Sequence, residues 1–183
     1  FPAAPDRFLS FLPLSHAYEH SAGQFLPIGL GAEIWYAESL ERLAGNIAEA
    51  KPTVMVVVPR LFEVLRDKIL RNLTERGRAT GWVARQALAL AARQAPRTGD
   101  GLRRMLVART IAPAIRQRFG GAIKAMVSGG APLNPDVGRF FELMGMTVLQ
   151  GYCQTESGPV VSCNRPKAGV AVATVGPPLT DTE

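Results

Sequence analysis

The sequence is 183 residues long, which is enough for one domain with its own hydrophobic core. Hydrophobic residues make up 47% and charged residues 20%, and the 18 Gly and 14 Pro form no repeat, which excludes a collagen-like or low-complexity chain. The net charge is +6, no apolar run is long enough to span a bilayer, and the two cysteines, Cys153 and Cys163, provide no disulfide framework, so we expect a cytoplasmic protein.

The first third of the chain alternates predicted strands and helices. Strands are predicted at residues 7–14 (ended by Pro13), 32–37 and 53–58. Helices are predicted at 16–30, from Ser39 as N-cap to about residue 50, and from about residue 60 to 71. The run at 53–58 is almost continuously apolar, which favours a parallel strand covered on both faces.

The remainder begins with helices and then returns to alternation. Helices are predicted at about 80–94 and 102–119, separated by the break P-R-T-G-D-G, with Pro113 starting or kinking the last part. Next come a strand at 123–127, a helix at 134–144 capped by Asn134, and a strand at 146–149 that breaks at Gly151. Short strands are predicted at 160–163 and 172–175. The order predicts an α/β fold, with a mainly parallel sheet flanked by helices and a helical insertion at about 66–118.

That insertion concentrates the positive charge. Residues 66–118 hold 13 Lys and Arg against three acidic residues, a local charge of +10, whereas the rest of the chain sums to −4. Such a segment could bind nucleic acid or anionic lipid, or it could be only a solvated face. Trp82 is the only aromatic residue between Phe62 and Phe119, so side chains for base stacking are scarce. We therefore expect no nucleic-acid partner, and peripheral membrane contact remains the functional alternative.

Two polar segments follow predicted strands. Tyr152, Thr155 and Glu156 come after the strand that breaks at Gly151, and ligands of open α/β sheets bind just beyond the carboxyl ends of strands. A ring, a hydroxyl and a carboxylate placed there could hold a base, a phosphate and a divalent cation. The second segment, S-G-G-A-P-L at 128–133, allows close approach of a ligand to the backbone at the start of a helix. A polar turn and tight strand–helix packing are the structural alternatives.

A third pattern, H-A-Y-E-H, places His16, Glu19 and His20 at the spacing H-x-x-E-H. Two histidines four residues apart on a helix could share a zinc ion while the glutamate polarises a water. The site would need a further ligand, and Glu49, Glu63 and Glu75 are available without any pattern that ties them to it. A pair of surface histidines is the alternative.

Four ordered blocks resemble the adenylate-forming (AMP-binding) superfamily, and within it the long-chain fatty acid–CoA ligases. They are L-P-L-S-H-A-Y-E at 12–19, K-P-T-V-M-V-V-V-P-R-L-F-E at 51–63, V-S-G-G-A-P-L at 127–133 and Q-G-Y-C-Q-T-E-S at 150–157. The resemblance implies that residues 1–183 are a fragment of the larger N-terminal adenylation domain. The phosphate-loop segment and the C-terminal domain of the family are absent from this sequence, so we expect the fragment alone to be inactive.

The resemblance also implies roles for individual residues. Four residues of the second segment would line the adenine pocket: Gly129, Gly130, Ala131 and Pro132. Beside Gly151, Tyr152 would stack on the base, and Thr155 would contact the α-phosphate. Glu156 would ligate Mg²⁺, and His16 would lie near the reacting carboxylate or the tunnel in which the thioester forms. Cys153 stands where the family usually has glycine, and if that position needs a positive φ, a side chain costs about 1 kcal/mol or more.

The implied reaction uses ATP, Mg²⁺ and CoA. A fatty carboxylate attacks the α-phosphate of ATP, pyrophosphate leaves, and the CoA thiol then displaces AMP from the acyl-AMP. One alternative is a fatty-acyl-AMP ligase that passes the acyl group to a carrier protein. Another is a non-catalytic basic module that binds lipid or nucleotide.

Overall fold

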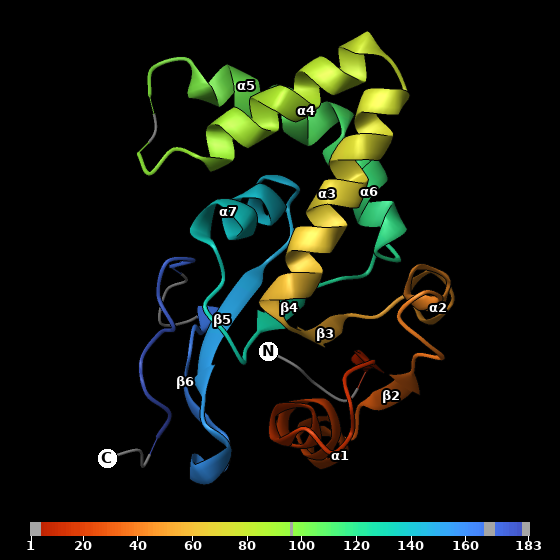
Figure 1. The fold of residues 1–183 in the computed structure, drawn as a ribbon, viewed down its shortest axis with the longest axis vertical. Coiled ribbons are helices and arrows are strands. Elements are labelled where there is room, and N and C mark those ends of the chain that lie inside the picture. Colours follow the sequence, from red (N-terminus) through yellow and green to blue (C-terminus); the bar gives the residue numbers. More distant parts are fainter. Residues whose placement is uncertain (1–4, 96, 167–170, 181–183) are drawn as a thin grey trace.

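A computed structural model of the chain describes residues 5–95, 97–166 and 171–180 (Figure 1). The described residues form a six-stranded sheet in the order β2-β1-β3-β4-β5-β6. Its strands are β1 (Arg7–Ser10), β2 (Glu33–Tyr36), β3 (Val54–Val57), β4 (Ala125–Ser128), β5 (Val148–Cys153) and β6 (Val160–Cys163). Neighbouring strands from β2 to β5 run parallel, and only the β5–β6 pair is antiparallel. The predicted α/β fold with a mainly parallel sheet is confirmed.

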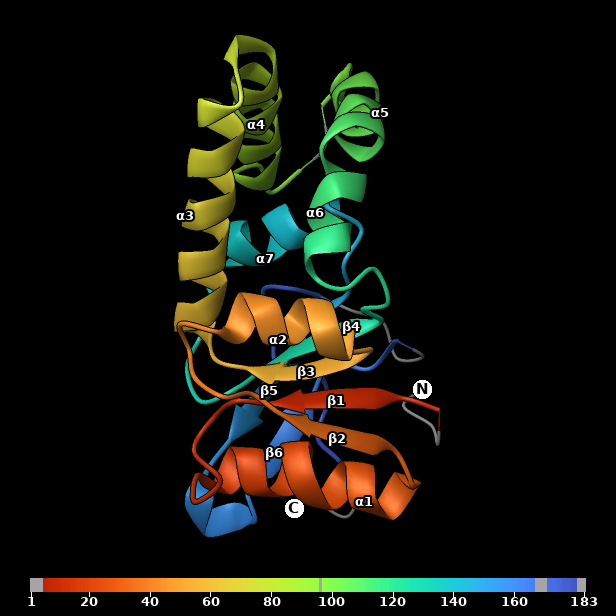
Figure 2. The ribbon, with the colours of Figure 1, turned by 90° about the vertical axis from the view of Figure 1, so that its right-hand side faces the viewer.

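Helices cover both faces of this sheet. They are the π-helical η1 (Glu19–Phe25), α1 (Leu26–Leu30), α2 (Leu43–Ala50), α3 (Pro59–Glu75), α4 (Arg78–Ala91), α5 (Asp100–Thr110), α6 (Ala112–Arg118), α7 (Pro135–Leu143) and the 3₁₀ turn η2 (Thr155–Ser157). Figure 2 shows α1 on one side of the strands and α2, α3, α6 and α7 on the other. None of the helices in the described ranges is long and apolar enough to cross a membrane.

The core lies between the sheet and the α2–α7 side. All residues of β3 are buried, as their continuous apolar character predicts for a central parallel strand. Phe141 of α7 packs edge-to-face on Phe62 of α3 and on Phe140, with ring centroids 5.2 and 5.5 Å apart. These aromatic contacts join α3, which follows β3, to α7, which follows β4.

The helical insertion predicted at 66–118 is also confirmed, with shifted boundaries. Its first helix, α3, already begins at Pro59, because proline is favoured in the first helical turn. The helix predicted at 102–119 is two helices, and Pro113 lies in the first turn of α6. Pro96, in the predicted break between the two middle helices, lies outside the described residues. Figures 1 and 2 place α4 and α5 at one end of the molecule, remote from α1 and β2.

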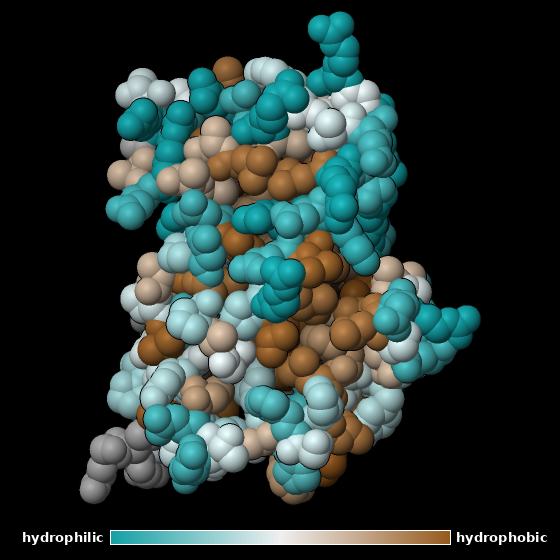
Figure 3. Space-filling view, in the orientation of Figure 1, coloured by the Kyte–Doolittle hydropathy of each residue, from teal (hydrophilic) through white to brown (hydrophobic). Residues whose placement is uncertain are grey.

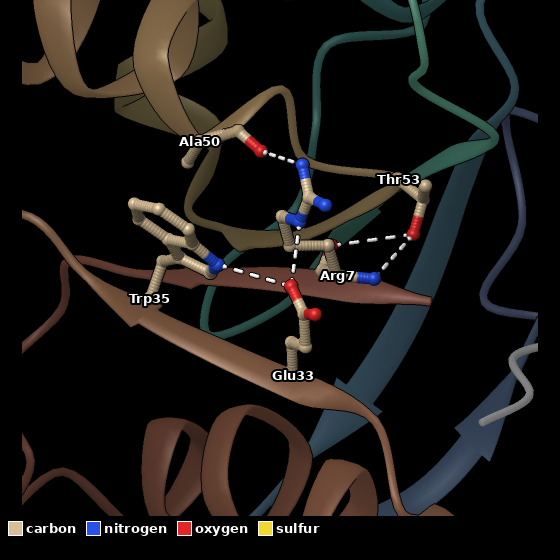
Figure 4. A network of polar contacts seen from close by, with 5 residues as sticks. All are labelled: Arg7, Glu33, Trp35, Ala50 and Thr53. Atoms are coloured by element: carbon tan, nitrogen blue, oxygen red, sulfur yellow. Dashed lines mark hydrogen bonds and ion pairs between the residues drawn. The ribbon is translucent and has the colours of Figure 1, made fainter. Parts of the chain in front are cut away.

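A polar network joins the amino ends of three strands (Figure 4). Arg7 pairs with Glu33 at 2.8 Å and also donates to the carbonyl of Ala50 at the end of α2, at 2.6 Å. The backbone amide of Arg7 donates to Thr53 Oγ1, just before β3, at 2.8 Å. Trp35 Nε1 donates to the same Glu33 carboxylate at 3.3 Å. The network therefore holds the edge of the sheet opposite to the carboxyl ends, where ligands are expected.

Three local predictions are wrong. The helix after Ser39 begins only at Leu43, with Arg42 rather than Ser39 as its N-cap, and the Ser39 hydroxyl accepts the amide of Arg42 in the turn that precedes it. The strand predicted to break at Gly151 continues to Cys153, because β6 pairs with it. The segment 172–175 is a turn rather than a strand, and β6 instead forms a single bridge from Ser162 to Pro178.

Candidate functional site

The polar segments after β4 and β5 meet at one edge of the sheet. The two strands are parallel neighbours, with Ser128 in register with Gln150, so the residues that follow them emerge side by side. The backbone of Gly130 lies next to the sulfur of Cys153. Burial raises the pKa of the Cys153 thiol, and the Gly130 backbone partly offsets this rise. The two segments predicted to bind one ligand are therefore in contact.

The loop after β4 rests on a buried tyrosine. The hydroxyl of Tyr18 donates to the carbonyl of Val127 at 3.0 Å, and a Cβ at Gly129 would lie 2.7 Å from the Tyr18 ring. Burial raises the pKa of Tyr18 well above its usual value, so the hydroxyl remains a donor. Gly130 has a φ of +84°, which side chains rarely adopt. Packing and backbone conformation thus both require glycine here, while Gly130 itself is exposed toward solvent.

The side chain of Gln150 connects the loop after β4 to β5 through hydrogen bonds. Its Oε1 accepts the amide of Leu133 at 2.6 Å, directly after Pro132. Its Nε2 donates to the carbonyls of Val172 and Thr174 at 3.3 and 3.2 Å. One buried amide therefore fixes the exposed residues Ala131 and Pro132 relative to β5.

The end of β5 presents Tyr152 to solvent, with 44% of its surface exposed. Gly151 lies against β6, where a Cβ would be 3.0 Å from the carbonyl oxygen of Ser162. Cys153 has no positive φ, so its side chain causes none of the backbone strain that its place in a usual glycine position suggested. An exposed ring beside an exposed loop leaves a place where a flat ligand can stack.

Thr155 and Glu156 follow on the turn η2, and both are exposed. The turn is closed by the amide of Gln154, which donates to Pro159 O at 2.7 Å, and by the amide of Ser157, which donates to Gln154 O at 3.1 Å. Among the ion pairs of the described residues, none involves Glu156. A carboxylate without a cationic partner, next to a hydroxyl, fits the oxygen ligands that Mg²⁺ prefers.

A family model described as "AMP-binding enzyme" matches residues 2–183. The chain belongs to this family of AMP-binding enzymes. Long chain acyl-CoA synthetase 8 of Arabidopsis thaliana is 30% identical over 191 residues, which cover 95% of this chain and 26% of that protein. Long-chain-fatty-acid–CoA ligase FadD15 of Mycobacterium tuberculosis is 30% identical over 181 residues, which cover 95% of this chain and 30% of that protein.

Solved structures of CoA ligases share the fold of this AMP-binding enzyme. A benzoate CoA ligase from Burkholderia xenovorans LB400 has a TM-score of 0.61 at 23% identity, over 98% of this chain and 28% of that one. ATP-bound MatB from Rhodopseudomonas palustris has a TM-score of 0.63 at 18% identity, over 97% of this chain and 26% of that one. The chain thus spans less than a third of the length of each of these proteins.

The H-A-Y-E-H segment of the AMP-binding enzyme does not assemble a metal centre. His16 and His20 are exposed, whereas Glu19 is fully buried, where Gly23 leaves room for its carboxyl group. Burial raises the pKa of Glu19, against smaller opposing effects of Ser10 and Gln24. His16 Nδ1 accepts the amide of Tyr18 at 3.2 Å. In the described part of the chain, no group of three or more His, Cys, Asp or Glu could hold a metal ion.

An apolar groove of ≈ 560 Å³ lies between α2 and α3, visible as the brown surface between these helices in Figure 3. Its apolar lining includes Phe11, Leu12, Leu43, Ile47, Val58, Leu61, Val64, Leu65, Ile69 and Phe119. A side-chain methyl group of Val58, the residue after β3, would lie 4.0 Å from a Cβ atom added at Gly130. The groove of the AMP-binding enzyme therefore reaches the exposed loop after β4.

Sequence reasoning missed Tyr18 and Gln150 as residues that build this site. Both belong to the quoted blocks, L-P-L-S-H-A-Y-E and Q-G-Y-C-Q-T-E-S, so their place in the blocks was the available signal. Their partners, Val127 and Leu133, lie 109 and 17 residues away along the chain, and no local pattern reveals such contacts.

Proposed function

We propose that the full-length protein to which these residues belong activates a long-chain fatty acid with ATP and transfers the acyl group to CoA. The observation that supports the proposal is that the Gly129–Pro132 loop and the segment with Tyr152, Thr155 and Glu156 come from neighbouring parallel strands, with Gly130 next to Cys153. Membership of the AMP-binding family supports the adenylation step. The relatives at 30% identity, which are named as a long chain acyl-CoA synthetase and a long-chain-fatty-acid–CoA ligase, support a long-chain fatty acid as substrate and CoA as acceptor.

In this proposal each exposed group has one task. Tyr152 stacks on the adenine of ATP, whose ring edge lies along Gly129, Gly130, Ala131 and Pro132. The Thr155 hydroxyl donates to the α-phosphate. Glu156 would hold Mg²⁺, which would supply positive charge that offsets the charge of the phosphates. Positioning of the carboxylate against the α-phosphate supplies much of the remaining acceleration, and no enzyme nucleophile is needed.

The groove between α2 and α3 is our candidate for the acyl chain. Its lining is mainly apolar, and burying hydrocarbon in it contributes about 0.8 kcal/mol for each CH₂ group. Through Val58 it adjoins Gly130, so a chain lying in it would place its carboxyl end near the adenylate. We also propose that the exposed ring of His16 lies near the reacting carboxylate, because His16 is close in sequence to Tyr18, which supports the loop after β4.

The substitution Glu156→Gln in the full-length protein tests the metal-binding role. We expect pyrophosphate release to fall by about a hundred- to a thousandfold, because one electrostatic stabiliser of the transition state is lost. Raising the Mg²⁺ concentration should restore part of the rate. Glu75→Gln, which changes an equally exposed carboxylate at the end of α3, should leave the rate unchanged. A folded Glu156→Gln enzyme with the normal rate and normal Mg²⁺ dependence would contradict the assignment.

A further inference from the structure

Helix α4 has one outward face that combines cationic and apolar side chains. Exposed residues recur at helical spacing along it: Arg78, Trp82, Arg85, Leu88 and Ala89. The opposite face is buried against α3, α5 and α7 through Val83, Ala84, Ala87, Leu90 and Ala91. The outward face is therefore not needed to hold the fold together.

The cationic side chains on this face are those of Arg78 and Arg85. Among the ion pairs of the described residues, none involves Arg78 or Arg85. The whole segment 66–118 carries 13 basic against three acidic residues. A surface of this sign attracts an anionic partner, and the attraction falls as salt screens it.

Exposed apolar side chains lie among these arginines. Trp82 is 47% exposed and Leu88 is 36% exposed. Tryptophan is favoured at membrane interfaces, because its ring is apolar and its N–H can stay hydrated. A helix that mixes tryptophan and leucine with arginine has the composition of helices that lie in the plane of a lipid surface.

We infer that the outward face of α4 docks the protein on an anionic phospholipid surface. The arginines approach the phosphate and carboxylate headgroups, and Trp82 and Leu88 enter the boundary between headgroups and acyl chains. Single-stranded nucleic acid is the less suited partner, because stacking of successive bases needs a series of aromatic side chains and α4 offers only Trp82. Within the described residues, α4 lies at one end of the molecule (Figures 1 and 2).

The test is sedimentation of the full-length protein with vesicles of phosphatidylcholine, with and without phosphatidylserine. Binding should require phosphatidylserine and weaken as salt rises. The double substitution Arg78→Gln with Arg85→Gln should weaken binding about thirtyfold, and Trp82→Ala about tenfold or more. A matched control, Arg42→Gln with Lys51→Gln, removes the same charge from exposed residues at the two ends of α2 and should bind as the wild type does.

All the substituted side chains on α4 are exposed, so circular dichroism should show unchanged folding. Equal binding to vesicles with and without phosphatidylserine would overturn the proposal. So would equal losses for the α4 and α2 variants, or retention on an oligonucleotide resin with no binding to any vesicle. Because vesicle binding is measured without substrates, the outcome does not depend on the proposed enzymatic activity.

Discussion

Tyr18 joins two parts of the chain that are far apart in sequence and are both expected at the site. Its ring packs against Gly129 and its hydroxyl donates a hydrogen bond to the carbonyl of Val127, so Tyr18 connects the H-A-Y-E-H segment to the loop after β4. His16 also bonds the Tyr18 backbone. A group expected near the carboxylate is thereby coupled to a loop expected near adenine.

The substitution Gly129→Ala tests this coupling. The added Cβ would lie 2.7 Å from the Tyr18 ring, so either the ring or the loop must shift. We expect kcat/KM for ATP in the full-length enzyme to fall by about ten- to a hundredfold, since small displacements of binding groups are costly. Gly29→Ala is the control, because a Cβ there meets nothing within 4 Å. Equal kinetics for the two variants would show that the contact does not position the loop.

The buried carboxyl group of Glu19 leads to a prediction about how the stability of the fold depends on pH. Burial raises its pKa in the folded state, whereas the unfolded chain has the ordinary value, so the native state keeps a proton that the unfolded state releases. At low pH the carboxyl group is neutral in both states, and burying it costs little free energy. As pH rises from the ordinary glutamate pKa through the raised pKa of the folded state, the folded protein loses stability relative to the unfolded chain. The melting temperature of Glu19→Gln minus that of the wild type should therefore increase from pH 4 to pH 8. A difference that stays constant with pH would contradict the burial effect.

At the scale of elements, helix α7 carries the residues that follow the loop after β4. It begins with a capping bond in which Asn134 Oδ1 accepts the amide of Asp136 at 2.9 Å. The cap therefore fixes the start of the helix to which the Gly129–Pro132 loop leads. Asn134 was predicted as the N-cap from sequence, and this prediction is confirmed.

Removing this cap should loosen the start of α7. Asn134→Ala is expected to cost about 1 kcal/mol, which corresponds to roughly fivefold faster hydrogen exchange of the first-turn amides. Asn134→Ser keeps an oxygen acceptor and should exchange nearly as the wild type does. Exchange that is unchanged in the alanine variant would mean that packing, rather than the cap, holds this end of the helix.

The elements differed in how well sequence predicted them. Continuous apolar runs such as β3 were placed correctly, because burial on both faces of a sheet demands them. The segment 172–175 has the same kind of residues but is a turn. Val172 is buried against Gly138 of α7, and the carbonyls of residues 172 and 174 accept side-chain amides from Gln150 and Asn164. Hydrogen bonds from these distant side chains replace strand pairing, and no local sequence pattern predicts them.

The same distinction applies to the site. Thr155 and Glu156 were expected beyond a strand end, and they lie exposed on η2. Tyr152 was expected there too, but it is an exposed residue of β5 itself. That expectation needed only the order of a strand followed by polar residues. The concern over Cys153 could not be settled from sequence, because the sign of φ depends on the pairing of β5 with β6. The functional roles of Tyr152, Thr155 and Glu156 remain predictions.

At the scale of the whole molecule, we propose that the described residues form one wall of the site. The chain covers 26% and 30% of the lengths of the two acyl-CoA synthetase relatives named above, so its activity belongs to the full-length protein. The sheet edge, the groove and the α4 face serve three different ligands in our account, namely ATP, the acyl chain and a lipid surface. Each can be disrupted by substitutions that leave the other two intact.

The most direct test of the central claim is pyrophosphate release from Mg-ATP by the full-length protein, measured with a long-chain fatty acid and without CoA. Adenylation precedes transfer, so we expect release of pyrophosphate and formation of acyl-AMP without CoA, no release without the fatty acid, and conversion of acyl-AMP to acyl-CoA when CoA is added. Benzoate should be a poor replacement for the fatty acid. Absence of any fatty-acid-dependent pyrophosphate release by the folded protein would contradict the account.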